Sequence, residues 1–171
     1  MKKILMILTM VAISGLATAQ HSAGDMNLNL GIGLGNNLVV GDQALPPIGV
    51  SFEYGIKDEI SVGGYLGYTS SDFASGFGDW TYSYTIIGAR GSYHHDLLGN
   101  KKIDTYGGLM LGYYIVSVDF GNTGITTGGE TNSFAYAAYI GGRYAFTDNL
   151  GAFAELGYGI ALLQIGANLK F

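Results

Sequence analysis

The sequence predicts an all-β protein, an eight-stranded antiparallel up-and-down transmembrane β-barrel, and three observations support that fold class. Glycine accounts for 29 of the 171 residues, well above its usual share of about 7%. Charged residues make up only 12%, about half of what a water-facing domain carries. Apolar residues alternate with small or polar residues at a period of two over successive segments, which is typical of strands with one oily face. No apolar run after the N-terminal stretch is long enough for a membrane-spanning helix.

Residues 1–19 have the features of an export signal. Two lysines follow the initial Met, residues 4–13 are apolar apart from one threonine, and Ala17-Thr18-Ala19 has the small-x-small pattern of a signal peptidase site. The apolar run is too short to cross a hydrocarbon core, which needs about 20 residues. We therefore expect a cleaved signal peptide over 1–19 and a single barrel domain over 20–171.

Each expected strand has one apolar face and one small or polar face. The first two, 27–34 and 48–56, alternate Leu, Ile, Val or Phe with Asn, Gly, Ser or Glu. Residues 57–59 form a turn to the third strand, 60–69, which alternates in the same way. Five further strands are expected at 81–95, 104–118, 133–146, 150–158 and 163–171. An even number of such strands is typical of bacterial transmembrane barrels, because lipid tolerates no unpaired strand edge.

The connections alternate in length, which predicts the orientation of the barrel. Long connections are expected at 35–46, 70–80 and 119–132, and short ones at 57–59 and 147–149. Short turns usually lie on the periplasmic side and longer loops outside. This orientation predicts two aromatic girdles, with Tyr54, Tyr93, Tyr144, Phe146 and Phe171 at the periplasmic rim and Tyr68, Tyr113 and Tyr158 at the outer rim.

Charged residues within the expected strands share their parity with the glycine-rich faces, so these faces are predicted to line the lumen. The expected lumen network consists of Glu53, Arg90, Arg143, Glu155 and Lys170. Eight strands enclose a lumen that side chains can fill, so we expect a plugged barrel. Because Gly141 should face Glu155 across the sixth and seventh strands, Arg143 is the expected diagonal partner of Glu155. The alternative is that the same charges line a gated ion path.

A secreted ligand-binding barrel of the lipocalin type is the main rival fold. It also has eight strands, but its interior is oily and its exterior faces water. That polarity would place the large apolar faces of this chain in a small lumen and the charged faces outside, so the lipid-facing arrangement is favoured.

Four segments carry a resemblance to a known family: IGARGSYH at 87–94, YGGLMLGY at 106–113, GAFAELGYG at 151–159 and GANLKF at 166–171. They resemble the outer-membrane β-barrel domain family, the eight-stranded size class that includes OmpA-like and OmpX-like barrels. The resemblance implies an outer-membrane location, with outer-membrane lipids and the barrel assembly machinery as partners. The alternating C-terminal strand ending in an aromatic residue resembles the signal read by that machinery, here Leu163, Ile165, Ala167, Leu169 and Phe171.

Candidate chemical motifs are few. His94-His95-Asp96 suggests a metal or acid-base site, but neighbours on a strand point to opposite faces, so we interpret the two histidines as polar residues of the periplasmic rim. The glycine-rich segment 31–35 lies in an expected strand and precedes no helix, so it is not a phosphate-binding loop. With no cysteine in the chain, thiolate chemistry is excluded. We predict no catalytic, cofactor-binding or metal-binding residues.

The leading functional hypothesis is a non-enzymatic outer-membrane barrel that serves envelope integrity or surface interaction through its outer loops. A narrow channel for ions or small solutes is the first alternative, and a lipid-modifying enzyme is the second. An enzyme would need a base beside its nucleophile, and no histidine lies in the expected outer half. A net charge of −5 without a basic run disfavours nucleic acid as a partner. The outer loops carry acidic residues and no Lys or Arg, so contact with lipopolysaccharide phosphates would need divalent cations: Asp42, Asp72, Asp79, Asp119 and Glu130.

Overall fold

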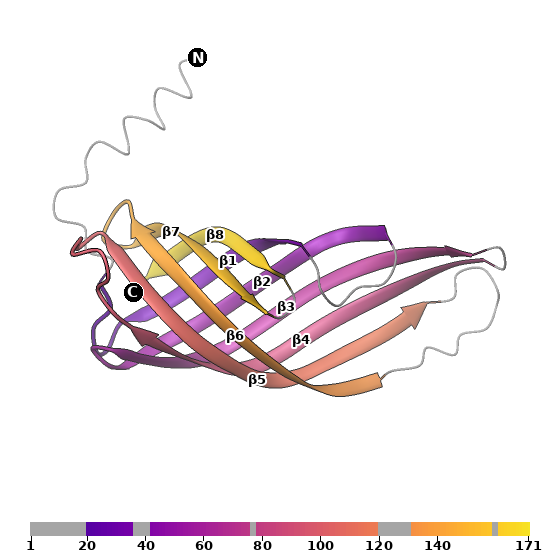
Figure 1. Ribbon diagram of the computed structural model, residues 1–171, viewed down its shortest axis with the longest axis horizontal. Coiled ribbons are helices and arrows are strands. Elements are labelled where there is room, and N and C mark those ends of the chain that lie inside the picture. Colours follow the sequence, from indigo (N-terminus) through magenta and orange to yellow (C-terminus); the bar gives the residue numbers. More distant parts are fainter. Residues whose placement is uncertain (1–19, 36–41, 76–77, 120–130, 159–160) are drawn as a thin grey trace, which may run out of the picture.

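Eight antiparallel strands in chain order form one closed barrel, as the sequence predicted (Figure 1). The computed structural model describes residues 20–35, 42–75, 78–119, 131–158 and 161–171. The strands are β1 (Met26–Leu34), β2 (Asp42–Lys57), β3 (Ile60–Ser75), β4 (Gly78–His94), β5 (Ile103–Asp119), β6 (Thr131–Ala145), β7 (Leu150–Tyr158) and β8 (Leu163–Lys170). The expected signal peptide lies outside the described residues. No helix in the described part of the chain is long and apolar enough to cross a membrane.

Pairing of β1 with β8 closes the sheet. Leu30 of β1 faces Val50 of β2 on one side and Ala167 of β8 on the other. The expected register of the β6–β7 hairpin is confirmed, because Gly141 of β6 faces Glu155 of β7. Closure gives each of the eight strands a neighbour on both sides, which is the condition for a sheet to exist in lipid.

The strands at the centre of the sequence are longer than expected. β2 begins at Asp42 instead of residue 48, and β3 and β4 remain paired up to Ser75 and Gly78, where we expected a loop over 70–80. The polar residues of this segment predict a loop, but the backbone ladder of an antiparallel hairpin forms between main-chain groups and can continue through polar residues. Here they pair across the hairpin, as when the Thr81 hydroxyl donates to Asp72 Oδ1 at 2.8 Å.

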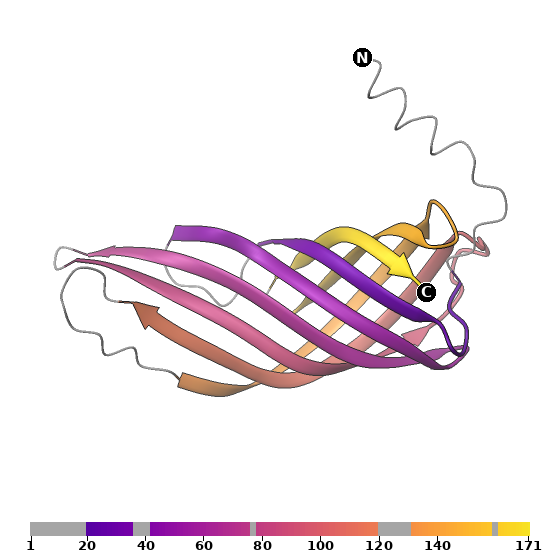
Figure 2. The same cartoon turned by 180° about the vertical axis from the view of Figure 1, so that it is seen from behind.

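The barrel wall is uneven in height. β1, β7 and β8 have 9, 9 and 8 residues, whereas β2 to β6 have 15 to 17. The longer strands extend past the shorter ones on the right of Figure 1, and the view from behind shows the same extension (Figure 2). We call this the loop end. The opposite, turn end carries the short connections between β2 and β3, β4 and β5, and β6 and β7, together with the C-terminus.

Apolar side chains cover the outside of the barrel and polar ones fill the inside. Leu109, Ile140 and Tyr136 are among the outward side chains with more than 60% of their surface exposed. The buried residues include many charged and polar side chains. This distribution is the reverse of the one that a soluble ligand-binding barrel requires. Most aromatic side chains expected at the rims lie on the exposed face, among them Tyr54, Tyr93 and Phe171 towards the turn end and Tyr68, Tyr113 and Tyr158 towards the loop end, whereas Phe146 is half-buried.

Candidate functional site

A network of five charged side chains fills the middle of the lumen towards the turn end. Its members come from five strands and are no more than 7% exposed: Glu53 of β2, Arg90 of β4, Asp104 of β5, Arg143 of β6 and Glu155 of β7. Glycines on the same inward face leave room for these long side chains. A Cβ atom at Gly141, for example, would lie 2.7 Å from Glu155 Cγ.

Arg90 bridges two carboxylates. Its Nη2 lies 2.7 Å from Glu155 Oε1 and 3.1 Å from Glu53 Oε1. The guanidinium carbon lies 4.0 Å from the ring centroid of Tyr139, so a cation–π contact adds to the ion pairs. In addition, the Tyr106 hydroxyl donates to Glu155 Oε1 at 2.8 Å.

Arg143 joins opposite walls of the barrel. Its Nη2 donates to Glu53 Oε1 at 2.8 Å and its Nη1 to Asp104 Oδ2 at 3.1 Å. Glu53 also accepts hydrogen bonds from the hydroxyls of Ser61, at 2.6 Å, and Ser92, at 3.0 Å. Its carboxylate is 0% exposed and takes two guanidinium groups and two hydroxyls, so Glu53 is the hub of the network.

The structure brings together four of the five residues expected in the lumen network, but with different partners. The expected Arg143–Glu155 pair was wrong, since Arg143 pairs with Glu53 and Asp104 while Arg90 pairs with Glu155. Pairing between the sixth and seventh strands predicts Glu155 as the partner, whereas the long side chain of Arg143 also reaches across the narrow lumen to Glu53.

Lys170, the fifth expected residue, lies apart from the network at the turn end. It forms an ion pair with Asp25 at 2.8 Å, and both side chains are nearly 20% exposed. Asp104 was not expected in the network, although its position in the sequence indicates an inward side chain. Asp104 has the same parity as the buried Tyr106, and it lies directly opposite Arg143 in the β5–β6 ladder.

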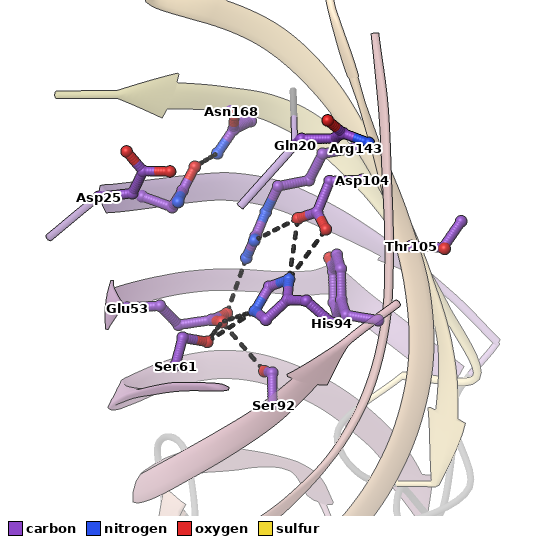
Figure 3. A network of polar contacts seen from close by, with 12 residues as sticks. Gln20, Asp25, Glu53, Ser61, Ser92, His94, Asp104, Thr105, Arg143 and Asn168 are labelled. Atoms are coloured by element: carbon purple, nitrogen blue, oxygen red, sulfur yellow. Dashed lines mark hydrogen bonds and ion pairs between the residues drawn. The ribbon is translucent and has the colours of Figure 1, made fainter. Parts of the chain in front are cut away.

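His94 is a buried member of this cluster, which corrects its interpretation as a rim residue. It is 4% exposed, because β4 continues through His94 with the inward parity and pairs it with Tyr106. Its Nδ1 lies 2.9 Å from Asp104 Oδ1 and its Nε2 lies 2.9 Å from Ser61 Oγ, as Figure 3 shows. His95 is exposed, as expected for the next residue of a strand.

The chain Ser61–His94–Asp104 has the connectivity of a catalytic triad, with a hydroxyl, an imidazole and a carboxylate in hydrogen-bond reach. The sequence-based expectation concerned only the outer half of the barrel, whereas this chain of contacts lies at the turn end. Two features oppose nucleophilic chemistry. The Ser61 hydroxyl donates to Glu53 at 2.6 Å, and Ser61 is only 1% exposed. These bonds hold the buried carboxylates of Glu53 and Asp104 in place.

Two hollows lie on either side of the network. The smaller, of about 50 Å³, lies towards the loop end and is lined by Tyr65, Arg90 and Glu155 among others. The larger, of about 350 Å³, opens at the turn end and is lined by the three histidines of the chain, together with Asp58, Glu59, Asp96 and Asp104. We call the larger one the mouth hollow. The two share no lining residue, so the ion network separates them. No group of three or more His, Asp or Glu side chains in the described ranges is placed to hold a metal ion.

A closed barrel of eight antiparallel strands, with an apolar exterior and an ion-paired interior, has the architecture of small outer-membrane β-barrels. No protein-family model matches the chain, and no curated protein matches it.

Solved structures do match. The chain is similar to OprG of Pseudomonas aeruginosa, with a TM-score of 0.62, 15% identity, and coverage of 89% of this chain and 98% of that one. It is similar to the N-terminal β-barrel domain of OprF of Pseudomonas aeruginosa, with a TM-score of 0.59, 15% identity and coverage of 88% and 100%. It is also similar to Ail, the attachment invasion locus protein of Yersinia pestis, with a TM-score of 0.56, 15% identity and coverage of 87% and 99%. The chain therefore has the fold of the eight-stranded outer-membrane barrels.

Proposed function

We propose that the chain is a small integral outer-membrane protein, non-enzymatic and closed to solutes, that serves envelope integrity or surface interaction through its loop end. The observation that carries this proposal is the inverted polarity of the barrel, with apolar side chains outside and ionic ones inside. Only a surrounding lipid phase makes that distribution favourable, because apolar surface in water costs about 25 cal/mol per Å². Outer-membrane lipids are then its immediate partners.

The location can be tested by fractionation and gel mobility. Folded protein from the outer-membrane fraction should migrate differently unboiled and boiled. A soluble periplasmic pool with a single mobility would overturn the membrane assignment.

The buried ion network supports a closed lumen. Arg90, Glu53 and Arg143 span the cross-section between the two hollows, and leaving one of these charges unpaired would cost about 3 to 5 kcal/mol. Wild-type protein in planar bilayers should therefore show no sustained conductance. Large, long-lived openings from wild-type protein would refute the plug.

A narrow channel is the second candidate, favoured by the sharing of Glu53. Its Oε1 lies near both Arg90 and Arg143, so an exchange of partners could open a path without stranding a charge. If the barrel is a narrow channel, the same bilayer recordings would show brief, small openings. The Glu53→Gln variant would change how often these openings occur. Silence of both wild type and Glu53→Gln would exclude it.

An enzyme is the third candidate, and only the Ser61–His94–Asp104 connectivity favours it. A fluorophosphonate probe would label an activated serine. We expect no adduct on the folded protein, and Ser61→Ala serves as the matched control. An adduct at Ser61 that depends on His94 would replace the non-enzymatic proposal, and a lipid profile of cells with and without active protein would then identify the acyl substrate.

Surface interaction would use the extension of β2 to β6 at the loop end. Ail of Yersinia pestis has been solved in complex with the heparin analogue sucrose octasulfate. In this chain Asp42 and Asp72 face each other across the extension, which disfavours a polyanion at that position. We therefore propose a partner that is neutral or basic there. Binding of cells or isolated loops to cationic beads and to sulfated beads would distinguish a basic partner from a polyanionic one.

A further inference from the structure

Residues 20–25 fold back across the turn end and cover the mouth of the barrel. The Gly24 amide donates to the Gly55 carbonyl at 2.8 Å, and the Gly55 amide donates to the Asp25 carbonyl at 2.8 Å. Lys170 Nζ donates to the Gln20 carbonyl at 3.0 Å. Gln20 and Asp25 are both labelled beside the ion network in Figure 3. We call residues 20–23 the stopper.

His21 is the part of the stopper that enters the barrel. Its ring stacks on the ring of His94 with a centroid distance of 3.9 Å and an interplanar angle of 16°, and the residue is 8% exposed. Gly55 provides the space, because a Cβ atom there would lie 2.7 Å from His21 Cε1. Neither ring nitrogen of His21 has a hydrogen-bond partner among the described residues. Stacking and packing therefore hold a ring that suits this position only when it is uncharged.

The charged groups around His21 act in both directions. Burial, and next the neighbouring His94, lower the pKa of His21 below its usual 6.5. The pKa is raised by smaller amounts by Asp104 of β5, the Ile60 backbone of β3 and Asp25, which lies just beyond the stopper. Asp58 and Glu59 from the β2–β3 turn line the same hollow.

The sign of the pH dependence follows from that lowered pKa. A displaced His21 binds a proton more readily than a docked one. The docked form is thus fully favoured above pH 6.5, and its advantage is lost as the pH falls below that value.

We propose that residues 20–23 are a proton-released stopper of the barrel mouth, hinged at Gly24 and held shut by the neutral His21 ring between Gly55 and His94. Gly24 has a φ of 90°, a left-handed backbone conformation that glycine adopts without strain. Protonation places a charged, buried ring beside His94, and the ring moves into water. The hydrogen bonds of Gly24 and Asp25 to Gly55 remain, so the hinge stays attached while displacement of the His21 ring uncovers His94 and widens the mouth hollow.

A spin label tests this directly, because the chain contains no cysteine. Ser22 is exposed, so Ser22→Cys carries a nitroxide on the stopper of the full chain folded in detergent. We expect an immobile spectrum at pH 7.5. Below pH 6.5 the ratio of mobile to immobile label should rise by up to about tenfold per pH unit until the docked ring itself titrates.

Three matched variants make the result specific. His21→Phe keeps a flat ring that cannot be charged, so its label should stay immobile at pH 5. Gly55→Ala removes the space for the ring, so its label should be mobile at both pH values. A label on the exposed Leu98, in the β4–β5 connection at the same end, should not respond to pH. A wild-type spectrum that is unchanged at pH 5, an equal response in His21→Phe, or an equal response at Leu98 would each overturn the proposal.

Discussion

Arg143 reaches across the lumen from β6 to Glu53 on β2, where its Nη2 lies 2.8 Å from Oε1. The two residues are 90 positions apart in the sequence, and their strands are not neighbours in the sheet. Neither side chain is more than 2% exposed. One ion pair therefore braces opposite walls of the barrel, and its contribution to stability can be measured.

Arg143→Leu should lower the free energy of unfolding by about 3 to 5 kcal/mol, because Glu53 and Asp104 would lose a buried counter-charge. The urea midpoint of the folded barrel in lipid vesicles measures this loss. Lys170→Leu is the matched control, since its ion pair with Asp25 lies at the rim and should contribute no more than about 1 kcal/mol. Equal effects of the two variants would contradict a structural role for the lumen network.

The two inward glutamates should differ in importance. Glu53 accepts from two arginines and two serines, whereas Glu155 accepts from Arg90 and Tyr106. Glu53→Gln should therefore lower the unfolding midpoint more than Glu155→Gln in the same vesicles. The reverse order would show that Glu53 is not the hub.

Phe171 tests the proposed assembly signal at the C-terminus. Its ring is 64% exposed on the outer face, while its backbone pairs with Met26 at the closing seam. Because only the side chain changes, Phe171→Ser should leave that pairing intact and yet reduce the amount of assembled barrel in cells. Refolding of purified Phe171→Ser in detergent is the control. Normal barrel yield in cells would mean that Phe171 is an ordinary rim aromatic.

Asp42 and Asp72 face each other in the β2–β3 ladder at the loop end. Like charges directly opposite are destabilising, so Asp42→Asn should raise the thermal midpoint at low salt. The gain should vanish at about 1 M salt, where the screening length is roughly 3 Å. If calcium raised the thermal midpoint of wild type but not of Asp42→Asn, the two carboxylates would instead share a bridging cation. Such a cation is what contact with lipopolysaccharide phosphates would need.

The sequence alone determined the closed barrel and the sidedness of its residues. Alternation with a period of two assigns each position of a strand to one face, so Glu53, Arg90, Arg143 and Glu155 had to share the interior once the oily faces were assigned to the exterior. The tight turn at 147–149 likewise fixed the register of Gly141 against Glu155. Both are local properties, since they depend on residues a few positions apart.

The partners inside the lumen were decided only by the tertiary structure. Arg143 pairs with Asp104 directly opposite on β5 and with Glu53 across the lumen, because a guanidinium side chain can reach the far wall of a narrow barrel. The expected partner, Glu155, pairs with Arg90 instead. His94 is buried because β4 ends on it with the side chain facing inward. His21 lies beside His94 in the barrel because Gly55 leaves space for its ring. Sequence periodicity assigns a residue to a face, but contacts across a lumen depend on how the whole sheet curves and closes.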